Sequence, residues 1–242
     1  MKLNVMLAVL VALLVSGCAS MRLDESTEKQ IRNVAIVSLV PERANLERIG
    51  ITVFGNDRID FDVGGRITAT IDETVARRIA AARPGWTVKR ISYDRAALVK
   101  RVRGPGLVIS FAEEKIEREL ADLARTNALD AMIVVTGRRF ENQRGDGVGV
   151  VMGSRMTTVA NAAVHANIDA RIVGADGKVL VRGAFGTPEP PKGIKPAEYG
   201  LTYELKDNLR PEIVKRLSDA MAEQIVRSLN KRLDQLGLEA RR

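Results

Sequence analysis

Apolar positions in the first half of the chain follow two periods, which predict strands and helices in alternation. A nearly continuous apolar run at 33–40 is typical of a strand inside a sheet that is covered on both faces, and 131–137 has the same character. Over 66–83 the apolar residues recur every four positions, which predicts a helix. The residues of that stripe are Ile67, Ile71, Val75 and Ile79.

Shorter segments between these elements are less regular. Residues 49–54 and 58–63 alternate, which predicts a hairpin that turns at 55–57. A strand is expected at 86–93, followed by a short helix that Asp94 caps. Ser110 and Glu113 have the spacing of a capping box, and the helix that they open is expected to end at Asn127 in a left-handed conformation.

The second half predicts a β region and then one long helix. A long alternating strand is expected at 157–173, with a tight turn at 174–177 and an antiparallel return at 178–185. Residues 186–200 contain four prolines and are interpreted as an irregular loop. Pro211 suits a first helical turn, and Gly237 lies past the helix end. The apolar stripe of this helix is Ile213, Leu217, Met221, Ile225, Leu229, Leu233 and Leu236.

This order of elements predicts an α/β fold. We expect a mixed sheet with helices packed on it, a late antiparallel hairpin and a long C-terminal helix. The apolar segments between 33 and 240 form one continuous series without an internal repeat, so a single domain is expected over that range.

The N-terminus has the pattern of an export signal. Lys2 precedes an unbroken apolar run over 5–15, which has the length of a signal peptide. The sequence Val15-Ser16-Gly17-Cys18 then resembles the lipobox of bacterial lipoproteins. This resemblance implies cleavage between Gly17 and Cys18 and attachment of acyl chains such as palmitate to Cys18. The alternative is an uncleaved anchor with an unmodified cysteine.

Residues 18–32 would then form a polar tether between the lipid and the domain. Ala19 and Ser20 follow the cysteine, and the lack of an aspartate there resembles lipoproteins of the outer membrane. We therefore expect a lipid-anchored protein of the bacterial cell envelope, on the outer membrane and facing the periplasm.

The charge balance is basic. The chain has 38 Lys and Arg against 30 Asp and Glu, a net charge of +8, and removal of 1–17 would take away only Lys2. Aromatic residues make up 4% of the chain, too few for the stacking platforms of nucleic-acid binders, so no nucleic-acid partner is expected. The cations indicate a solvated basic surface or attraction to anionic lipids or cell-wall polymers.

Candidate catalytic groups are few. His165 is the only imidazole, and Asp169 lies on the same strand face but about 13 Å away at strand spacing, so the two do not form a triad. Asp60 and Asp62 would lie about 6.6 Å apart, which suits paired-carboxylate hydrolysis, but ordinary solvent-facing alternation explains them better. No catalytic residue, metal site or cofactor is predicted.

A glycine-rich segment at 145–153 suggests a possible role in binding. It lacks the spacing of a phosphate-binding loop and lies between two strands, so it is interpreted as a flexible hairpin tip. The alternative is that its apolar residues form a contact loop for a partner or a membrane, and replacement of Val150 and Val151 by serine is expected to leave stability almost unchanged. The apolar residues of the segment are Val148, Val150, Val151 and Met152.

Three segments together resemble a known group of proteins. They are the opening strand at 34–37, the helix and strand at 123–137, and the strand, turn and strand at 168–180. The pattern resembles envelope lipoproteins and periplasmic modules related to the curli secretion-channel lipoprotein, the lipoprotein activators of peptidoglycan synthases, and the N-terminal domain of TolB. The turn Gly-Ala-Asp-Gly and the hairpin at 49–63 depart from that pattern.

The resemblance implies an interaction module without catalytic residues. We therefore expect a non-enzymatic, lipid-anchored envelope protein that binds another envelope protein or itself. The alternatives are a subunit of a secretion or surface-assembly channel and a hydrolase of envelope polymers.

Overall fold

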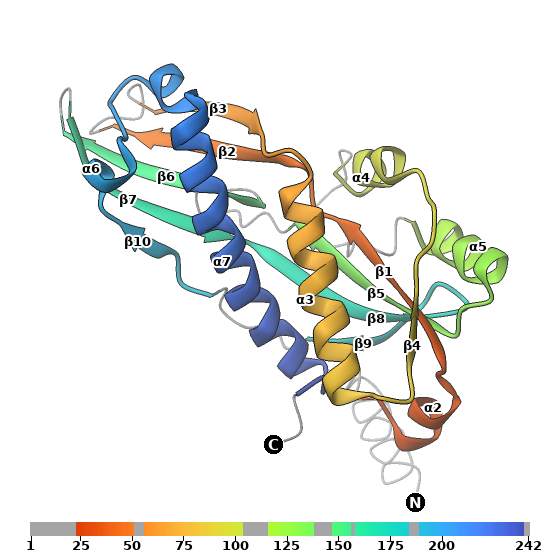
Figure 1. Ribbon diagram of the computed structural model, residues 1–242. Coiled ribbons are helices and arrows are strands. Elements are labelled where there is room, and N and C mark those ends of the chain that lie inside the picture. Colours follow the sequence, from red (N-terminus) through yellow and green to blue (C-terminus); the bar gives the residue numbers. More distant parts are fainter. Residues whose placement is uncertain are drawn as a thin grey trace, which may run out of the picture.

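A computed structural model describes residues 23–50, 56–103, 116–137, 147–155, 158–183 and 189–239. The described chain forms two five-stranded sheets (Figure 1). In order across sheet A, the strands are β4 (Thr87–Lys89), β1 (Asn33–Leu39), β5 (Ala131–Gly137), β8 (Ile168–Gly174) and β9 (Val179–Arg182). In order across sheet B, they are β10 (Lys192–Ile194), β7 (Thr158–Ala166), β6 (Val148–Arg155), β2 (Arg43–Ile49) and β3 (Asp57–Asp62).

Both sheets are mixed, which confirms the predicted fold class. In sheet A, β1 is parallel to β4 and β5, and the later strands are antiparallel. In sheet B, β2 is parallel to β6, and the other pairs are antiparallel. The chain passes repeatedly between the two sheets. The strands β7 and β8, for example, follow one another along the chain but belong to different sheets, and Asn167 alone separates them.

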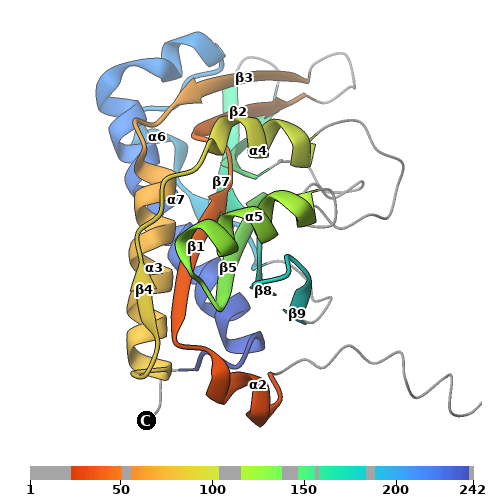
Figure 2. The same cartoon turned by 90° about the vertical axis from the view of Figure 1, so that its right-hand side faces the viewer.

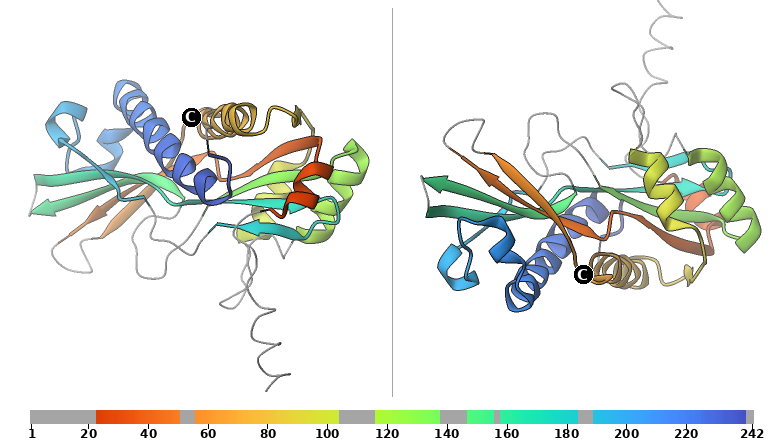
Figure 3. Two further views of the ribbon diagram at one scale, coloured as in Figure 1. Left: turned by 90° about the horizontal axis from the view of Figure 1, so that it is seen from below. Right: turned by 90° about the horizontal axis from the view of Figure 1, so that it is seen from above.

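The helices form layers on both sides of sheet A (Figures 2 and 3). The long helices α3 (Arg66–Ala82) and α7 (Pro211–Gln235) pack against each other on one side, and α7 contacts strands of both sheets. The helices α4 (Arg95–Arg103) and α5 (Glu117–Asn127) cover the other side of sheet A. The remaining helices are α2 (Glu25–Gln30), α6 (Pro196–Tyr199) and the 3-10 helix η3 (Leu205–Leu209).

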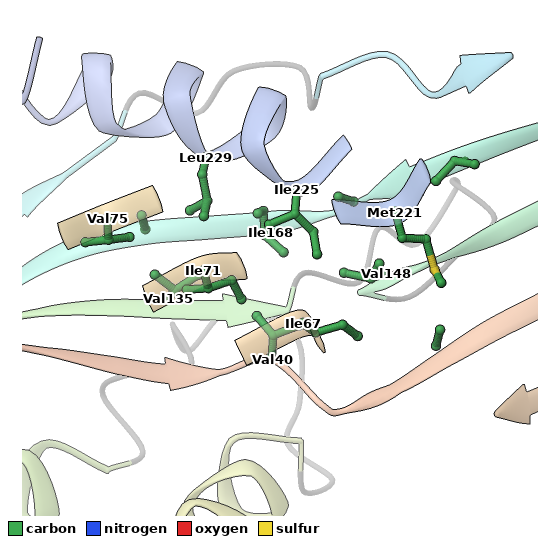
Figure 4. Packing of buried hydrophobic residues seen from close by; sticks show 14 of the residues in the cluster. Val40, Ile67, Ile71, Val75, Val135, Val148, Ile168, Met221, Ile225 and Leu229 are labelled. Atoms are coloured by element: carbon green, nitrogen blue, oxygen red, sulfur yellow. The ribbon is translucent and has the colours of Figure 1, made fainter. Parts of the chain in front are cut away.

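The larger core lies beneath α3 and α7. Figure 4 shows side chains of α3 and α7, among them Ile71 and Ile225, that meet the strands of both sheets. All seven stripe residues of α7 are buried, which confirms the prediction for this helix. A second core, with Leu120 and Met132, fills the space between sheet A and the helices α4 and α5. Among the described residues, no helix combines the length and apolarity needed to cross a membrane.

Element ends follow local chemistry. Asp94 caps α4 through a bond from the backbone N–H of Ala97, as predicted. The left-handed residue after α5 is Ala128, with φ 47°, and not Asn127, whose side chain instead donates to the carbonyl of Leu123. Ser110 and Glu113 lie outside the described residues.

Several expected boundaries are wrong. The first strand of the early hairpin is β2, which begins at Arg43 and ends at Ile49, because Ala44 and Leu46 of this segment enter the core. Only Thr87–Lys89 of the strand expected at 86–93 pairs with β1. The long strand at 157–173 is two strands, and the expected loop at 186–200 contains β10 and α6.

The start of the domain also differs from the prediction. Residues expected in a polar tether form α2, and the next residue, Ile31, is buried in the core. Leu23 packs against the same core. Residues 23–32 therefore belong to the folded domain and not to a tether, because two apolar side chains hold this segment against the core.

Candidate functional site

One face of sheet B has no helix over it among the described residues (Figure 3). The strand register places one residue from each of five strands in a row across this face. A second, shorter row lies two residues further along the strands, on the side away from sheet A. We call these eight residues the distal face: Arg58, Glu47, Val151, Ala163 and Gly193 in the first row, and Ile49, Gly153 and Asn161 in the second.

The two sides of sheet B differ in their surroundings. Residues that alternate with the distal face, such as Leu46, Val150 and Val164, are completely buried in the core that includes α7. Val151 and Ala163 on the distal face are only half-buried, and Asn161 and Gly193 are exposed. Sheet B therefore has one packed face and one face that solvent reaches.

Nearer to sheet A, the same side of sheet B is closed by polar residues. Asn45 and His165 are buried on either side of Gly149, and His165 Nε2 lies 3.3 Å from Asn45 Oδ1. Asn45 Nδ2 also donates to the carbonyl of Val148 at 3.1 Å. A Cβ atom on Gly149 would lie well inside van der Waals contact with Asn45, so only glycine fits there.

These positions overturn the contact-loop hypothesis. Val148, Val150 and Met152 belong to the central strand β6, with 2%, 0% and 0% of their surface exposed, and they cannot reach a partner. Val151 alone of the four residues points to the accessible side. The glycines of β6 allow the Asn45 and Asn161 side chains to lie over the strand, which is why this segment resembled a flexible tip. Gly145 and Asp146 lie outside the described residues.

His165 and Asp169, which the sequence did not predict to form a triad, lie in different strands. His165 lies in β7 beside Asn45, while Asp169 lies in β8, beyond the break at Asn167. Asp169 forms ion pairs with Arg171 at 3.2 Å and with Arg232 of α7 at 4.0 Å. Burial, together with a smaller contribution from the Arg182 cation, lowers the pKa of Arg171 to about 10.

The carboxylates of β3 face solvent, as predicted. Asp60 pairs with Arg58 at 3.1 Å, and Asp62 accepts a hydrogen bond from the backbone N–H of Gly64 at 2.7 Å. Both residues are exposed, while Phe61 between them is buried.

Sequence reasoning missed one polar cluster, at the carboxyl end of β1. Arg95 donates to the carbonyls of Ser38 and Val40 and pairs with Glu42 at 3.2 Å, and Glu42 accepts from the backbone N–H of Thr68 at 2.9 Å. The Tyr93 hydroxyl accepts from the Ser38 N–H at 3.0 Å. These contacts satisfy backbone groups of β1 beyond Ala35, where pairing with β4 stops.

The ionisable groups of this cluster are shifted by their surroundings. Burial raises the pKa of Tyr93. Burial also raises the pKa of the nearby Asp72, against the opposing effect of the Arg95 cation. The contacts join β1 to α3 and α4, and the cluster has no motif in the sequence because its members come from three separate segments.

Gly17 and Cys18, the predicted cleavage and lipidation residues, lie outside the described residues. Within the part of the chain that the structure describes, no three His, Cys, Asp or Glu side chains gather in an arrangement that could hold a metal ion.

Comparisons with known proteins give little further information. No family model matches the chain, and no curated protein matches it. Among solved structures, the chain is similar to a lipoprotein from Neisseria meningitidis, with a TM-score of 0.27 and 16% identity over 81% of this chain and 99% of that one. A likeness at this level carries no inference about function, and the resemblance to the envelope groups named above stays a prediction.

Proposed function

We propose that this chain is a lipid-anchored protein of the bacterial cell envelope whose domain binds a protein partner through the distal face of sheet B. The proposal assigns the chain a binding role and no catalytic step. The observation that carries it is the contrast between the two sides of sheet B, one packed against α7 and the other accessible.

The anchor part of the proposal rests on the sequence. An apolar run of signal-peptide length ends in small residues followed by the only cysteine of the chain. Several acyl chains on that cysteine would hold the domain at a membrane, because each buried CH₂ contributes about 0.8 kcal/mol. The bacterial outer membrane is the proposed location, and the domain would lie on its periplasmic side.

The chemistry of the distal face favours a partner with bulky apolar side chains. Val151 and Ala163 lie at its middle, and the open space over Gly193 leaves room for a side chain of another protein. Glu47 and Arg58 flank this middle on one side, and Asn161 lies in the next row. An apolar centre with polar groups at its edge is typical of protein–protein interfaces.

The test is site-specific photocrosslinking in cells. A photoreactive residue replaces Val151 on the distal face or Ala80 on the exposed side of α3. We expect a crosslinked species from position 151 and none from position 80. The same species is expected to disappear when Ala163→Arg is added, because a charged side chain then occupies the middle of the face.

Two results would contradict the proposal. One is the same set of crosslinks from both positions, and the other is a crosslink at 151 that Ala163→Arg leaves unchanged. A thermal melt of Ala163→Arg is the control for folding. Because Ala163 is only half-buried, the variant is expected to unfold cooperatively near the temperature of the wild type.

A further inference from the structure

The first described segment is fixed firmly to the domain. Asp24 caps α2 through a hydrogen bond from the backbone N–H of Thr27 at 2.9 Å. Glu28 of α2 pairs with Arg83 at the end of α3 at 2.9 Å, and Ile31 is buried with 3% of its surface exposed. The chain therefore leaves the domain at one defined place, beside the C-terminal end of α3.

That place lies at one end of a long molecule. Asp130 accepts hydrogen bonds from the backbone N–H groups of Arg32 and Asn33, and the next residue, Ala131, pairs with Gly174 at the end of β8. From Gly174 the strands β8 and β7 run back to Thr158, a path of about 50 Å at strand spacing. Figure 1 shows α2 and the far end of β7 at opposite ends of the fold.

The lipid attachment residue is close to α2 along the chain. Leu23 follows Cys18 by five residues, which span at most about 18 Å when fully extended. The far end of sheet B lies well beyond that reach.

We infer that the end of the domain formed by α2 and the C-terminal end of α3 faces a lipid bilayer, and that sheet B projects away from it. This inference rests on the proposed lipidation of Cys18. The distal face is thereby held tens of ångströms from the membrane, where a second envelope protein can reach it.

The charges at this end indicate whether electrostatic attraction to lipid headgroups contributes to the orientation of the domain. Asp24, Glu25, Glu28 and Asp130 are the acidic groups at this end, and Lys29, Arg32 and Arg83 are the basic groups beside them, so the charges largely balance. Attraction to anionic lipid therefore adds little, and the tether length sets the orientation. Vesicles of zwitterionic phosphatidylcholine are accordingly a suitable membrane for the test.

Tryptophan fluorescence can report this orientation, because the chain has a single tryptophan. Its single tryptophan, Trp86, lies in the turn after α3, where its backbone N–H donates to the carbonyl of Arg83. The next residue, Thr87, donates to the carbonyl of Arg32, which places Trp86 at the α2 end. A variant with Trp86→Phe and Ala160→Trp moves the probe to an exposed position near the far end of β7.

The experiment measures energy transfer from tryptophan to a dansyl headgroup lipid in phosphatidylcholine vesicles, with full-length lipidated protein. We expect the emission of Trp86 to fall severalfold more than that of the tryptophan at position 160. Equal or reversed quenching would overturn the orientation while leaving the lipid anchor in place. An intact mass without acyl chains would overturn the orientation and the proposed anchor together.

Discussion

At the scale of single residues, Gly149 lies between the buried polar residues Asn45 and His165, where β6 has no room for a side chain. A Cβ atom there would clash with the backbone oxygen of Asn45, which cannot move without shifting β2. We expect Gly149→Ala to lower the free energy of unfolding by about 1–3 kcal/mol, as overpacking does. Urea unfolding of the purified domain measures this change.

Gly153 supplies the matched control in the same strand. A Cβ atom at this position would meet only the side chain of Asn161, which is exposed and can rotate away. Gly153→Ala is therefore expected to cost less than Gly149→Ala. Equal losses in the two variants would contradict the assigned role of the Asn45 backbone.

Asp130 gives a pH-dependent prediction at the same scale. Burial is the largest single effect on its pKa and raises it, but hydrogen bonds, chiefly from the backbone N–H groups of Asn33 and Arg32, together outweigh burial and leave the pKa below its usual value. A carboxyl group with a lowered pKa in the folded state stabilises the fold above its unfolded pKa of about 3.9, and this contribution is lost as the pH falls.

The comparison for this prediction is Asp130→Asn. At pH 7 the variant is expected to be less stable than the wild type by about 1 kcal/mol, because a neutral amide accepts these bonds more weakly. The difference is expected to shrink as the pH falls below about 4, when Asp130 itself becomes protonated. A difference that stays constant from pH 7 to pH 3 would exclude this role.

At the scale of elements, periodicity predicted the long helices α3 and α7 and the buried strands β1 and β5 of sheet A. The four-residue repeat of α3 and the seven-residue stripe of α7 face one core, so pattern and structure agree. The prediction failed at β6, where glycines indicated a flexible tip. Composition alone does not distinguish a glycine that gives freedom from one that makes room for a neighbouring side chain such as Asn45.

Two adjacent valines of β6 test this correction. Val150 is completely buried beneath α7, and Val151 lies on the distal face. Val150→Ser is expected to lower the free energy of unfolding by about 2–4 kcal/mol, because it leaves a cavity and buries a hydroxyl. Val151→Ser is expected to change it by less than about 1 kcal/mol.

The two variants are compared by thermal or urea unfolding under the same conditions. Small effects of both substitutions would restore the flexible-tip interpretation. Large effects of both would place Val151 in a packed environment and would remove the distal face as a binding surface.

At the scale of the whole molecule, the sequence indicated one mixed sheet and the structure has two. The alternation over 157–173 runs through Asn167 almost unbroken, so nothing in the pattern marks the residue at which the chain passes from sheet B to sheet A. The cluster of Glu42, Tyr93 and Arg95 was missed for a related reason, since only the fold brings these segments together.

At this scale we propose a domain that is held at a membrane by one end and has an accessible sheet face at the other. The two parts of the proposal depend on different parts of the chain. The accessible face follows from the strand register of sheet B, and the proposed anchor follows from the N-terminal sequence before α2. The anchor determines where the face is presented, so the lipidation of Cys18 is the central claim.

The most direct test of that claim is the intact mass of the protein purified from the membrane fraction of cells that express it. The account predicts a chain that begins at Cys18 and carries the added mass of its acyl chains, and it predicts that Cys18→Ala leaves an unprocessed, unacylated chain. A wild-type protein that begins at Met1, or that carries an unmodified Cys18, would contradict the account.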